Sequence, residues 1–219
     1  FPTRRSSDLD HFRTATGVSA RIDALLRNVP VDDPAALQHV AMQLRDLILH
    51  GDVPQDLTEA IASAYAQLGV AADGKSNAVV AVRSSATAED TTEFSFAGMF
   101  ESVLGVRGLP SLLDAVRVCW ASTFGARVLY YRLTRQMASE MPVAVIVQQM
   151  IPSEKSGVLF TVDPATRDDR HLVIEAAWGV GEVVVGGQVT PDHYLVDKVT
   201  GAVLERSTQR KDFLIELTS

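Results

Sequence analysis

The spacing of apolar residues changes once along the chain, near residue 140, and this change limits the possible folds more than any other feature. Before it, apolar residues such as Leu37, Leu44 and Ile48 recur at the three- and four-residue intervals of amphipathic helices. After it, short runs rich in Val and Ile, beginning with 143–150, are bounded by turn residues, as strands are. The sequence therefore predicts an α+β protein whose helices come mainly first and whose strands come mainly second.

This change of spacing divides the chain into segments. We expect 10–140 to form a helix-rich subdomain and 141–219 to form a β-rich subdomain. Residues 1–9 contain no methionine, no apolar signal-peptide core and no helical spacing. They resemble the translation of a sequencing-adapter oligonucleotide, so we expect them to be a non-native scar on a fragment; a genuine basic tail is the alternative.

The composition argues against several classes of protein. With 47% hydrophobic residues and no run of about 18 apolar residues, we expect a soluble chain without a membrane span. A net charge of −7 argues against a nucleic-acid surface, which needs clustered Lys and Arg, but permits a nucleotide site where a few positive charges converge. The single cysteine, Cys119, excludes an internal disulfide and fits the reducing cytoplasm.

The most informative short segment joins an apolar run to an arginine. Residues 78–82 are all apolar, and Arg83 follows them directly, ahead of the small and hydroxyl residues of 84–87. Open α/β sheets commonly bind ligands where such strands end, and the planar guanidinium matches a phosphate. An ion pair of this arginine with Glu89 or Asp90 is the alternative, and the residue types alone leave both open.

Two further positions extend this candidate phosphate site. Gly98 ends the segment 96–98, and a glycine, which has no Cβ, lets backbone N–H groups approach a phosphate closely. Ser102 follows four residues later with a hydroxyl that can face the same site. An ordinary turn at Gly98 is the alternative.

The second half of the chain carries candidates for the rest of a nucleotide site. The strand predicted at 143–150 ends in amides, and Gln149 with Met150 offers hydrogen bonds and apolar contact to a flat heterocycle. Glu175 and Glu182 lie near glycines, where they can meet ribose hydroxyls or Mg²⁺. The alternatives are solvated glutamines and a glycine-rich turn around a buried tryptophan. No pair of the five histidines has metal-ligand spacing, and no nucleophile–base–acid arrangement is present.

Together these segments resemble one family. The motifs that carry the resemblance, in this order and spacing, are Ala81–Asp90, Ser95–Gly98, Gln148–Met150, Ser156–Thr161 and Gly179–Glu182. They are similar to the ATP-grasp nucleotide-binding domain of the phosphoenolpyruvate synthase group, which includes pyruvate phosphate dikinase and rifampin phosphotransferase. The resemblance covers about residues 10–212 and favours the phosphate-binding interpretation of Arg83.

This resemblance implies a fold, a mechanism and roles for single residues. ATP would lie between two subdomains of an ATP-grasp-like domain. Its terminal phosphates would pass to a histidine on a separate swivelling domain, and from there to pyruvate or another acceptor. In the helix-rich subdomain, Arg83 would clamp the transferring phosphate. The other implied contacts are Gly98 and Ser102 to the phosphates, Gln149 and Met150 on the adenine side, and Glu182 near the ribose.

The chain also departs from the family's pattern. Met99 replaces a usual glutamine, and Ser102 replaces a usual threonine but keeps the hydroxyl. The family's glycine-rich, lysine-bearing segment is expected before residue 10. Its Mg²⁺-binding glutamate, the swivelling histidine domain and the acceptor-binding domain are expected outside this chain, beyond Ser219.

The resemblance therefore implies a domain incomplete at both ends, which alone binds ATP weakly and turns nothing over. The alternative is a degenerate module that binds nucleotide without transferring phosphate. The acceptor, whether pyruvate, a rifamycin antibiotic or a glucan, cannot be read from these residues.

Overall fold

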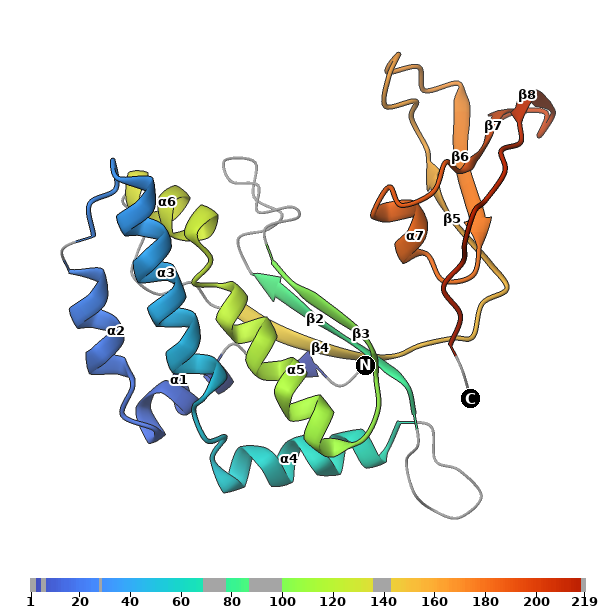
Figure 1. Cartoon of the computed structure of the whole chain (residues 1–219). Coiled ribbons are helices and arrows are strands. Elements are labelled where there is room, and N and C mark those ends of the chain that lie inside the picture. Colours follow the sequence, from blue (N-terminus) through green and yellow to red (C-terminus); the bar gives the residue numbers. More distant parts are fainter. Residues whose placement is uncertain are drawn as a thin grey trace. The chain divides into compact units, whose positions relative to one another are not determined.

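The computed structural model divides the chain into two units, Phe1–Met150 and Ile151–Ser219, which are described separately. The residues that the structure describes are 3–4, 7–27, 29–68, 78–86, 100–135 and 143–217. Both units contain helix and antiparallel sheet (Figure 1), so the predicted α+β class is confirmed. The division falls after Met150 rather than after residue 140.

The elements of the first unit are mainly helices. Its helices are α1 (Ser7–Ala15), α2 (Ser19–Leu26), α3 (Pro34–Leu49), α4 (Gln55–Ala66), α5 (Leu109–Ser122) and α6 (Ala126–Thr134). Its strands are β1 (Thr3–Arg4), β2 (Val80–Ala86), β3 (Ser102–Val106) and β4 (Val143–Gln149). The elements of the second unit are β5 (Lys155–Phe160), β6 (His171–Trp178), α7 (Glu182–Val185), β7 (Asp192–Asp197) and β8 (Val203–Ser207).

Local signals in the sequence account for several of these boundaries. The side chain of Asp33 accepts hydrogen bonds from the backbone N–H groups of Ala35 and Ala36, and Pro34 occupies the first turn, so α3 begins where the sequence predicts. The predicted interruption at Gly125 separates α5 from α6. α1 begins inside the segment predicted to be a scar, and Leu9 is buried in the core of the unit.

The sheet of the first unit has the strand order β1-β4-β2-β3, and all its neighbours are antiparallel. β4 pairs with β2 along its whole length, from Gln149 opposite Val80 to Val143 opposite Ala86. This pairing explains why the first unit extends to Met150: the strand predicted to open the β-rich subdomain is a central strand of the helix-rich one.

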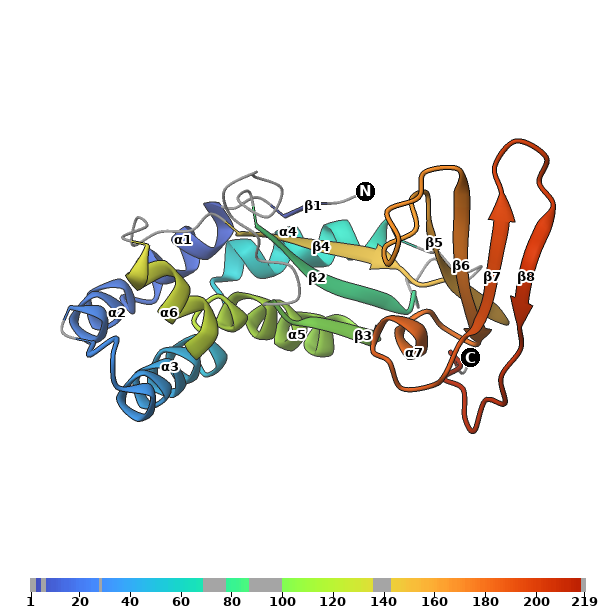
Figure 2. The ribbon, with the colours of Figure 1, turned by 90° about the horizontal axis from the view of Figure 1, so that it is seen from above.

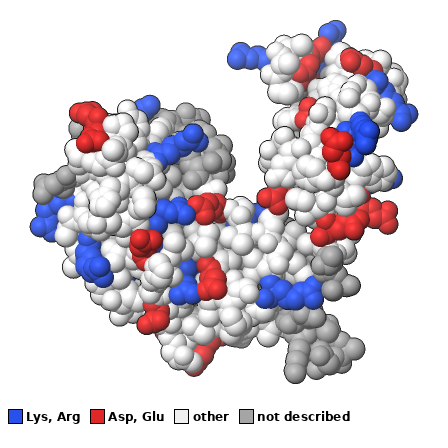
Figure 3. Space-filling model, in the orientation of Figure 1, with Lys and Arg blue, Asp and Glu red and all other residues white. Residues whose placement is uncertain are grey.

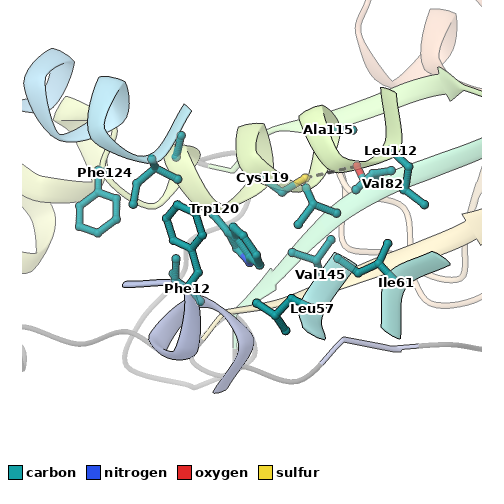
Figure 4. Close-up of a cluster of buried hydrophobic side chains, with 14 of the residues drawn as sticks. Phe12, Leu57, Ile61, Val82, Leu112, Ala115, Cys119, Trp120, Phe124 and Val145 are labelled. Carbon is teal, nitrogen blue, oxygen red and sulfur yellow. Dashed lines mark hydrogen bonds between the residues drawn. The ribbon is translucent and has the colours of Figure 1, made fainter. Parts of the chain in front are cut away.

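One face of this sheet forms the main core. Successive side chains of a strand point to opposite faces. Val82 of β2 and Val145 of β4 point toward α5, where Cys119 and Trp120 are also fully or almost fully buried (Figure 4). The ring of Trp120 lies 5.1 Å from that of Phe12, centroid to centroid. The helices therefore cover the face that carries the valines.

The second unit is a four-stranded antiparallel meander in the order β5-β6-β7-β8, and Figure 2 shows its strands side by side. The short helix α7 packs Val183 and Val184 against Ala177. The predicted hairpin around Thr200-Gly201 is confirmed: it joins β7 to β8, and Gly201 has the positive φ of +70° that the turn needs. None of the described helices is both long and apolar enough to cross a bilayer.

Candidate functional site

Arg83 lies on the sheet face that the main core leaves uncovered. It stands in the middle of β2, opposite Ser102 of β3 on one side and Ile146 of β4 on the other. Its neighbour Val82 is fully buried, whereas Arg83 and Ser102 are exposed. Because directly opposed residues share a face, the register places the side chains of Arg83 and Ser102 next to each other on the same face.

The position of Arg83 within its strand differs from the prediction. The strand was expected to end at Val82, but it continues to Ala86 because β4 supplies partners for Ser84, Ser85 and Ala86. The sheet is antiparallel throughout its described strands. The rule that places ligands at the ends of parallel strands therefore does not apply here. What exposes Arg83 is the two-residue alternation of the strand.

The same register separates the two glutamines at the end of β4. Gln149 is opposite the fully buried Val80, so it belongs to the helix-covered face although its own side chain, at the strand end, is exposed. Gln148 is opposite Ala81 and so shares the face of Arg83. Sequence reasoning did not single out Gln148 as the glutamine that shares this face. The alternation of buried residues along β4 was the available signal, since it assigns every second residue to the core.

Met150 also reaches this face. Its backbone N–H donates to the carbonyl of Val79 at 2.8 Å, which extends the ladder beyond β4. Its Sδ atom accepts a hydrogen bond from the N–H of Gly105 in β3 at 3.2 Å. The thioether therefore reaches from the end of β4 past β2 to β3. The structure thus brings Arg83, Ser102 and Met150 to one sheet face.

Contacts on the helix side support this strand pair. The hydroxyl of Ser84 donates to the carbonyl of Glu101 at 3.0 Å. The Sγ atom of Cys119 lies 3.5 Å from the carbonyl of Val82 and 3.6 Å from that of Glu101. Burial, and secondarily the negative charge of Glu101, raise the pKa of the Cys119 thiol to about 12. The thiol is therefore protonated at neutral pH and acts as a donor inside the core.

Several predicted residues lie outside the described part of the chain. Gly98 is one of them, as are Glu89 and Asp90, the acids proposed as alternative partners of Arg83. Among the described residues, the ion pairs do not include Arg83. The guanidinium is exposed, and no carboxylate among the described residues forms an ion pair with it.

The predicted ribose-side residue belongs to the second unit. Glu182 is exposed at the start of α7, directly after Gly181. Glu175 pairs across β6 and β7 with His193. The alternative interpretation required a buried Trp178. Instead, Trp178 is 49% exposed, and Lys155 Nζ lies 4.9 Å from the centre of its ring.

The charge distribution and the metal-binding potential complete the description. On the face shown in Figure 3, basic and acidic side chains are interspersed. The described ranges contain no group of three or more His, Cys, Asp and Glu side chains placed to hold a metal ion.

One hollow of the first unit lies away from the predicted site residues. A hollow of about 1030 Å³ lies between α2, α3 and the segment after α3, with Arg21, Asp46 and His50 among its lining residues. None of the predicted site residues lines it. Arg83 and Ser102 lie on the sheet face away from the main core, and both side chains are exposed.

Comparison with known proteins identifies the family. The family model described as "Pyruvate phosphate dikinase, AMP/ATP-binding domain" matches residues 5–218. The chain belongs to this family. The resemblance seen in the sequence is thus confirmed, and with it the ATP-grasp-like fold of this AMP/ATP-binding domain.

Similar proteins are much longer than this AMP/ATP-binding domain. A probable phosphoenolpyruvate synthase of Methanothermobacter thermautotrophicus is 45% identical over 206 residues, which are 94% of this chain and 30% of that protein. The phosphoenolpyruvate synthase of Pyrococcus furiosus is 41% identical over 192 residues, 87% of this chain and 23% of that protein. That of Aeropyrum pernix is 40% identical over 199 residues, 90% and 24% respectively. The chain therefore spans less than a third of the length of these relatives.

Proposed function

We propose that this domain is the ATP-binding part of a longer phosphotransferase. In that enzyme, phosphate from ATP passes to a histidine on a swivelling domain and then to an acceptor bound by a further domain. The observation that carries this proposal is the exposed Arg83 beside Ser102, on an open sheet face of a domain whose family binds AMP or ATP. The names of the relatives favour pyruvate over a rifamycin or a glucan as the acceptor.

In this proposal Arg83 holds the phosphate that is transferred. A guanidinium presents a fixed fork of N–H donors that matches a phosphate, and it stabilises the negative charge that develops during transfer. Ser102, directly across the ladder, adds a hydroxyl donor to the same face. Gly98, four residues before Ser102, contributes backbone N–H groups from the preceding segment.

The adenine side of the proposed site lies at the end of β4. Gln148 and Met150 are the side chains whose register favours contact on the Arg83 face. A thioether is soft and polarisable, and a glutamine amide offers both donor and acceptor to a heterocycle. Gln149 then contributes through its backbone or from the strand end, and Glu182 contacts the ribose.

The remaining parts of the enzyme are proposed on family grounds. Bound Mg²⁺ would neutralise part of the phosphate charge, and its ligands are proposed to lie in the rest of the parent protein. A cytoplasmic location agrees with a single cysteine that is buried and free. Neither a nucleic acid nor a membrane is among the proposed partners.

The experiment that tests the function uses the full-length protein that carries this chain. ATP-dependent formation of phosphoenolpyruvate from pyruvate is followed for the wild type, Arg83→Ala and Arg127→Ala; Arg127 is an exposed arginine on α6. We expect Arg83→Ala to lower kcat by about 10³-fold, the scale seen for arginines that stabilise phosphoryl transfer, and Arg127→Ala to leave it unchanged.

Three outcomes separate the interpretations. Turnover of Arg83→Ala within tenfold of the wild type would contradict the clamp. Wild-type protein that binds ATP in calorimetry yet phosphorylates no histidine would favour the nucleotide-binding module. Phosphohistidine that forms but is not passed to pyruvate would leave the ATP-binding part in place and redirect the search for the acceptor.

A further inference from the structure

Glu101 connects the candidate phosphate site with the helical layer. It directly precedes Ser102, and in the β2–β3 register it is opposite Ser84. Its carbonyl accepts hydrogen bonds from the Ser84 hydroxyl at 3.0 Å and the Cys119 thiol at 3.6 Å. Its carboxylate lies 2.8 Å from the guanidinium of Arg45 on α3, measured from Oε1 to Nη2. Three elements, β2, α5 and α3, thus meet at this one residue.

The alternation along β3 explains how these contacts reach the site. Glu101 and Val103 are two residues apart, so their side chains lie on the same face. Val103 packs against the main core, and the Glu101 side chain is therefore on the helix-covered face. Ser102 and its partner Arg83 have the opposite parity and lie on the exposed face. The ion pair between Arg45 and Glu101 therefore lies on the helix-covered face and anchors Glu101. The next residue, Ser102, is a proposed phosphate contact on the opposite face.

β3 needs such an anchor more than the other strands do. It is the terminal strand of the described sheet, in the order β1-β4-β2-β3, so β2 is its sole described strand partner. Its ladder with β2 also shifts register between Val80 and Val82. A slip of one residue would move the Ser102 hydroxyl to the other face, and edge strands with irregular ladders resist slipping least.

Arg45 is well placed to prevent such a slip. It lies on α3 between the fully or almost fully buried Ala41 and Ile48, one turn away on either side, and its side chain is 29% exposed. The Glu101 side chain is 44% exposed. A pair this close to solvent adds little to overall stability, but it fixes where the start of β3 lies relative to α3.

We propose that Arg45 is a positioning residue of the phosphate clamp. By holding Glu101 on the helix side of the sheet, it keeps Ser102 in register with Arg83 on the opposite side. The inference rests on the proposed function, because it takes Arg83 and Ser102 to be phosphate contacts. Arg45 itself touches no phosphate in this arrangement, since it lies on the covered face.

The test uses the full-length parent protein with Arg45→Gln, Glu101→Gln, the double variant and the charge exchange Arg45→Glu with Glu101→Arg. The matched control is Arg117→Gln. Arg117 is a 24% exposed arginine of the same helical layer that pairs with Asp114 and donates to the carbonyl of Gly51 at 3.1 Å. The readouts are kcat, the KM values for ATP and pyruvate, the melting temperature, and hydrogen exchange of the amides of 103–106.

Displacements of about 1 Å at a catalytic group cost up to about 100-fold in rate, so we expect Arg45→Gln and Glu101→Gln each to lower kcat by about 10- to 100-fold. The KM for pyruvate should not change, and exchange at 103–106 should become faster. The double variant should be no slower than either single variant, because both changes remove one interaction. The charge exchange should recover part of the rate, and Arg117→Gln should retain its kcat within about twofold.

A kcat of Arg45→Gln equal to that of the wild type, in a protein that Arg83→Ala inactivates, would overturn this inference and leave the proposed function intact. Losses in the double variant that equal the product of the single losses would also overturn it. So would a fall in kcat that follows melting temperature equally in Arg45→Gln and Arg117→Gln. A wild-type protein that neither binds nor consumes ATP would instead contradict the proposed function, and this inference with it.

Discussion

The two sheets have the same strand number and the same antiparallel pairing but are stabilised differently. In the first unit, helices bury one whole face, and residues such as Val82 and Val145 have no exposed surface. In the second unit, 151–217 is described, and the main cover of the sheet is α7, a helix of four residues. Its strand β5 is partly exposed on both faces. The same strand number and antiparallel pairing are therefore compatible with a core-dominated sheet and with one that depends on its turns.

The second unit has a small core, and hydrogen bonds in its turns contribute to its stability. The carboxylate of Asp197 accepts from the N–H groups of Val199 and Thr200, at 3.0 and 2.7 Å, in the β7–β8 hairpin. Asp192 pairs with the buried ammonium of Lys211 and thereby ties the C-terminal segment to the start of β7. Unit one is thus expected to be sensitive to cavities, and unit two to changes in turns and charges.

The largest expected effect tests the core of the first unit. Trp120→Ala removes a side chain that is 1% exposed and stacked on Phe12, so we expect a loss of about 3–5 kcal/mol in the free energy of unfolding. Trp178→Ala, in the second unit, removes a half-exposed ring and should cost about 1 kcal/mol or less. Urea unfolding followed by circular dichroism measures both. Equal losses would contradict the difference between the two cores.

A smaller effect is expected where the C-terminal segment passes the end of β6. Gly179 has a φ of +79°, and a Cβ at this position would collide with the carbonyl of Ile215. Gly187, also in the second unit, has a φ of +62° and open space around it. Both Ala variants cost about 1–2 kcal/mol for the left-handed backbone, and Gly179→Ala should cost about 1–3 kcal/mol more for the collision.

Unfolding in urea, followed by the emission of the adjacent Trp178 in a Trp120→Phe background, measures this difference between the two glycine variants. Gly179→Ala that is as stable as Gly187→Ala would show that the C-terminal segment does not hold its place against β6.

The smallest effect concerns acid. In the second unit, hydrogen bonds lower the pKa of four aspartates, which are Asp163, Asp168, Asp192 and Asp197. For Asp168 the main cause is the side chain of Arg170, whose Nη2 lies 2.7 Å from the carboxylate. A lowered pKa in the folded state adds stability above the unfolded value of about 3.9, and this stability is lost as the pH falls further.

The free energy of unfolding of the second unit should therefore decrease as the pH drops below about 4, before that of the core-dominated first unit. Acid titration followed by Trp178 emission and, separately, by the helical circular dichroism signal compares the units. Arg170→Ala should reduce the pH dependence of the Trp178 signal. Coincident acid transitions in the two signals, unaffected by Arg170→Ala, would argue against turn carboxylates as the source.

Much of the fold and part of the site could be predicted because their signals are local. The cap at Asp33, the interruption at Gly125 and the turn at Thr200-Gly201 each depend on residues within one turn of the position they determine. The family motifs likewise lie in short contiguous segments, so a single sequence was enough to find them. The motif residue Arg83 is exposed on the face away from the main core, and its role in phosphate binding stays a prediction.

Several differences between prediction and structure involve contacts between segments that are distant in the sequence. The expected division near residue 140 would have separated β4 from β2, its main partner. Choosing Gln149 over Gln148 required knowing which face of β4 is buried. The ion pair between Arg45 and Glu101 joins α3 to the residue that precedes β3, and no sequence motif contains both residues. The spacing of apolar residues within one segment does not show which distant segment it contacts.

By itself, the sequence determined the fold class, the cap at Asp33, the hairpin and the family, because these follow from side-chain preferences over a few residues. The tertiary structure alone decided which residues share a face with Arg83. That choice depends on the register between β2, β3 and β4, and a shift of one residue would reverse every side chain. The buried valines under α5 favour this register, because a shift of one residue would turn their side chains away from the core.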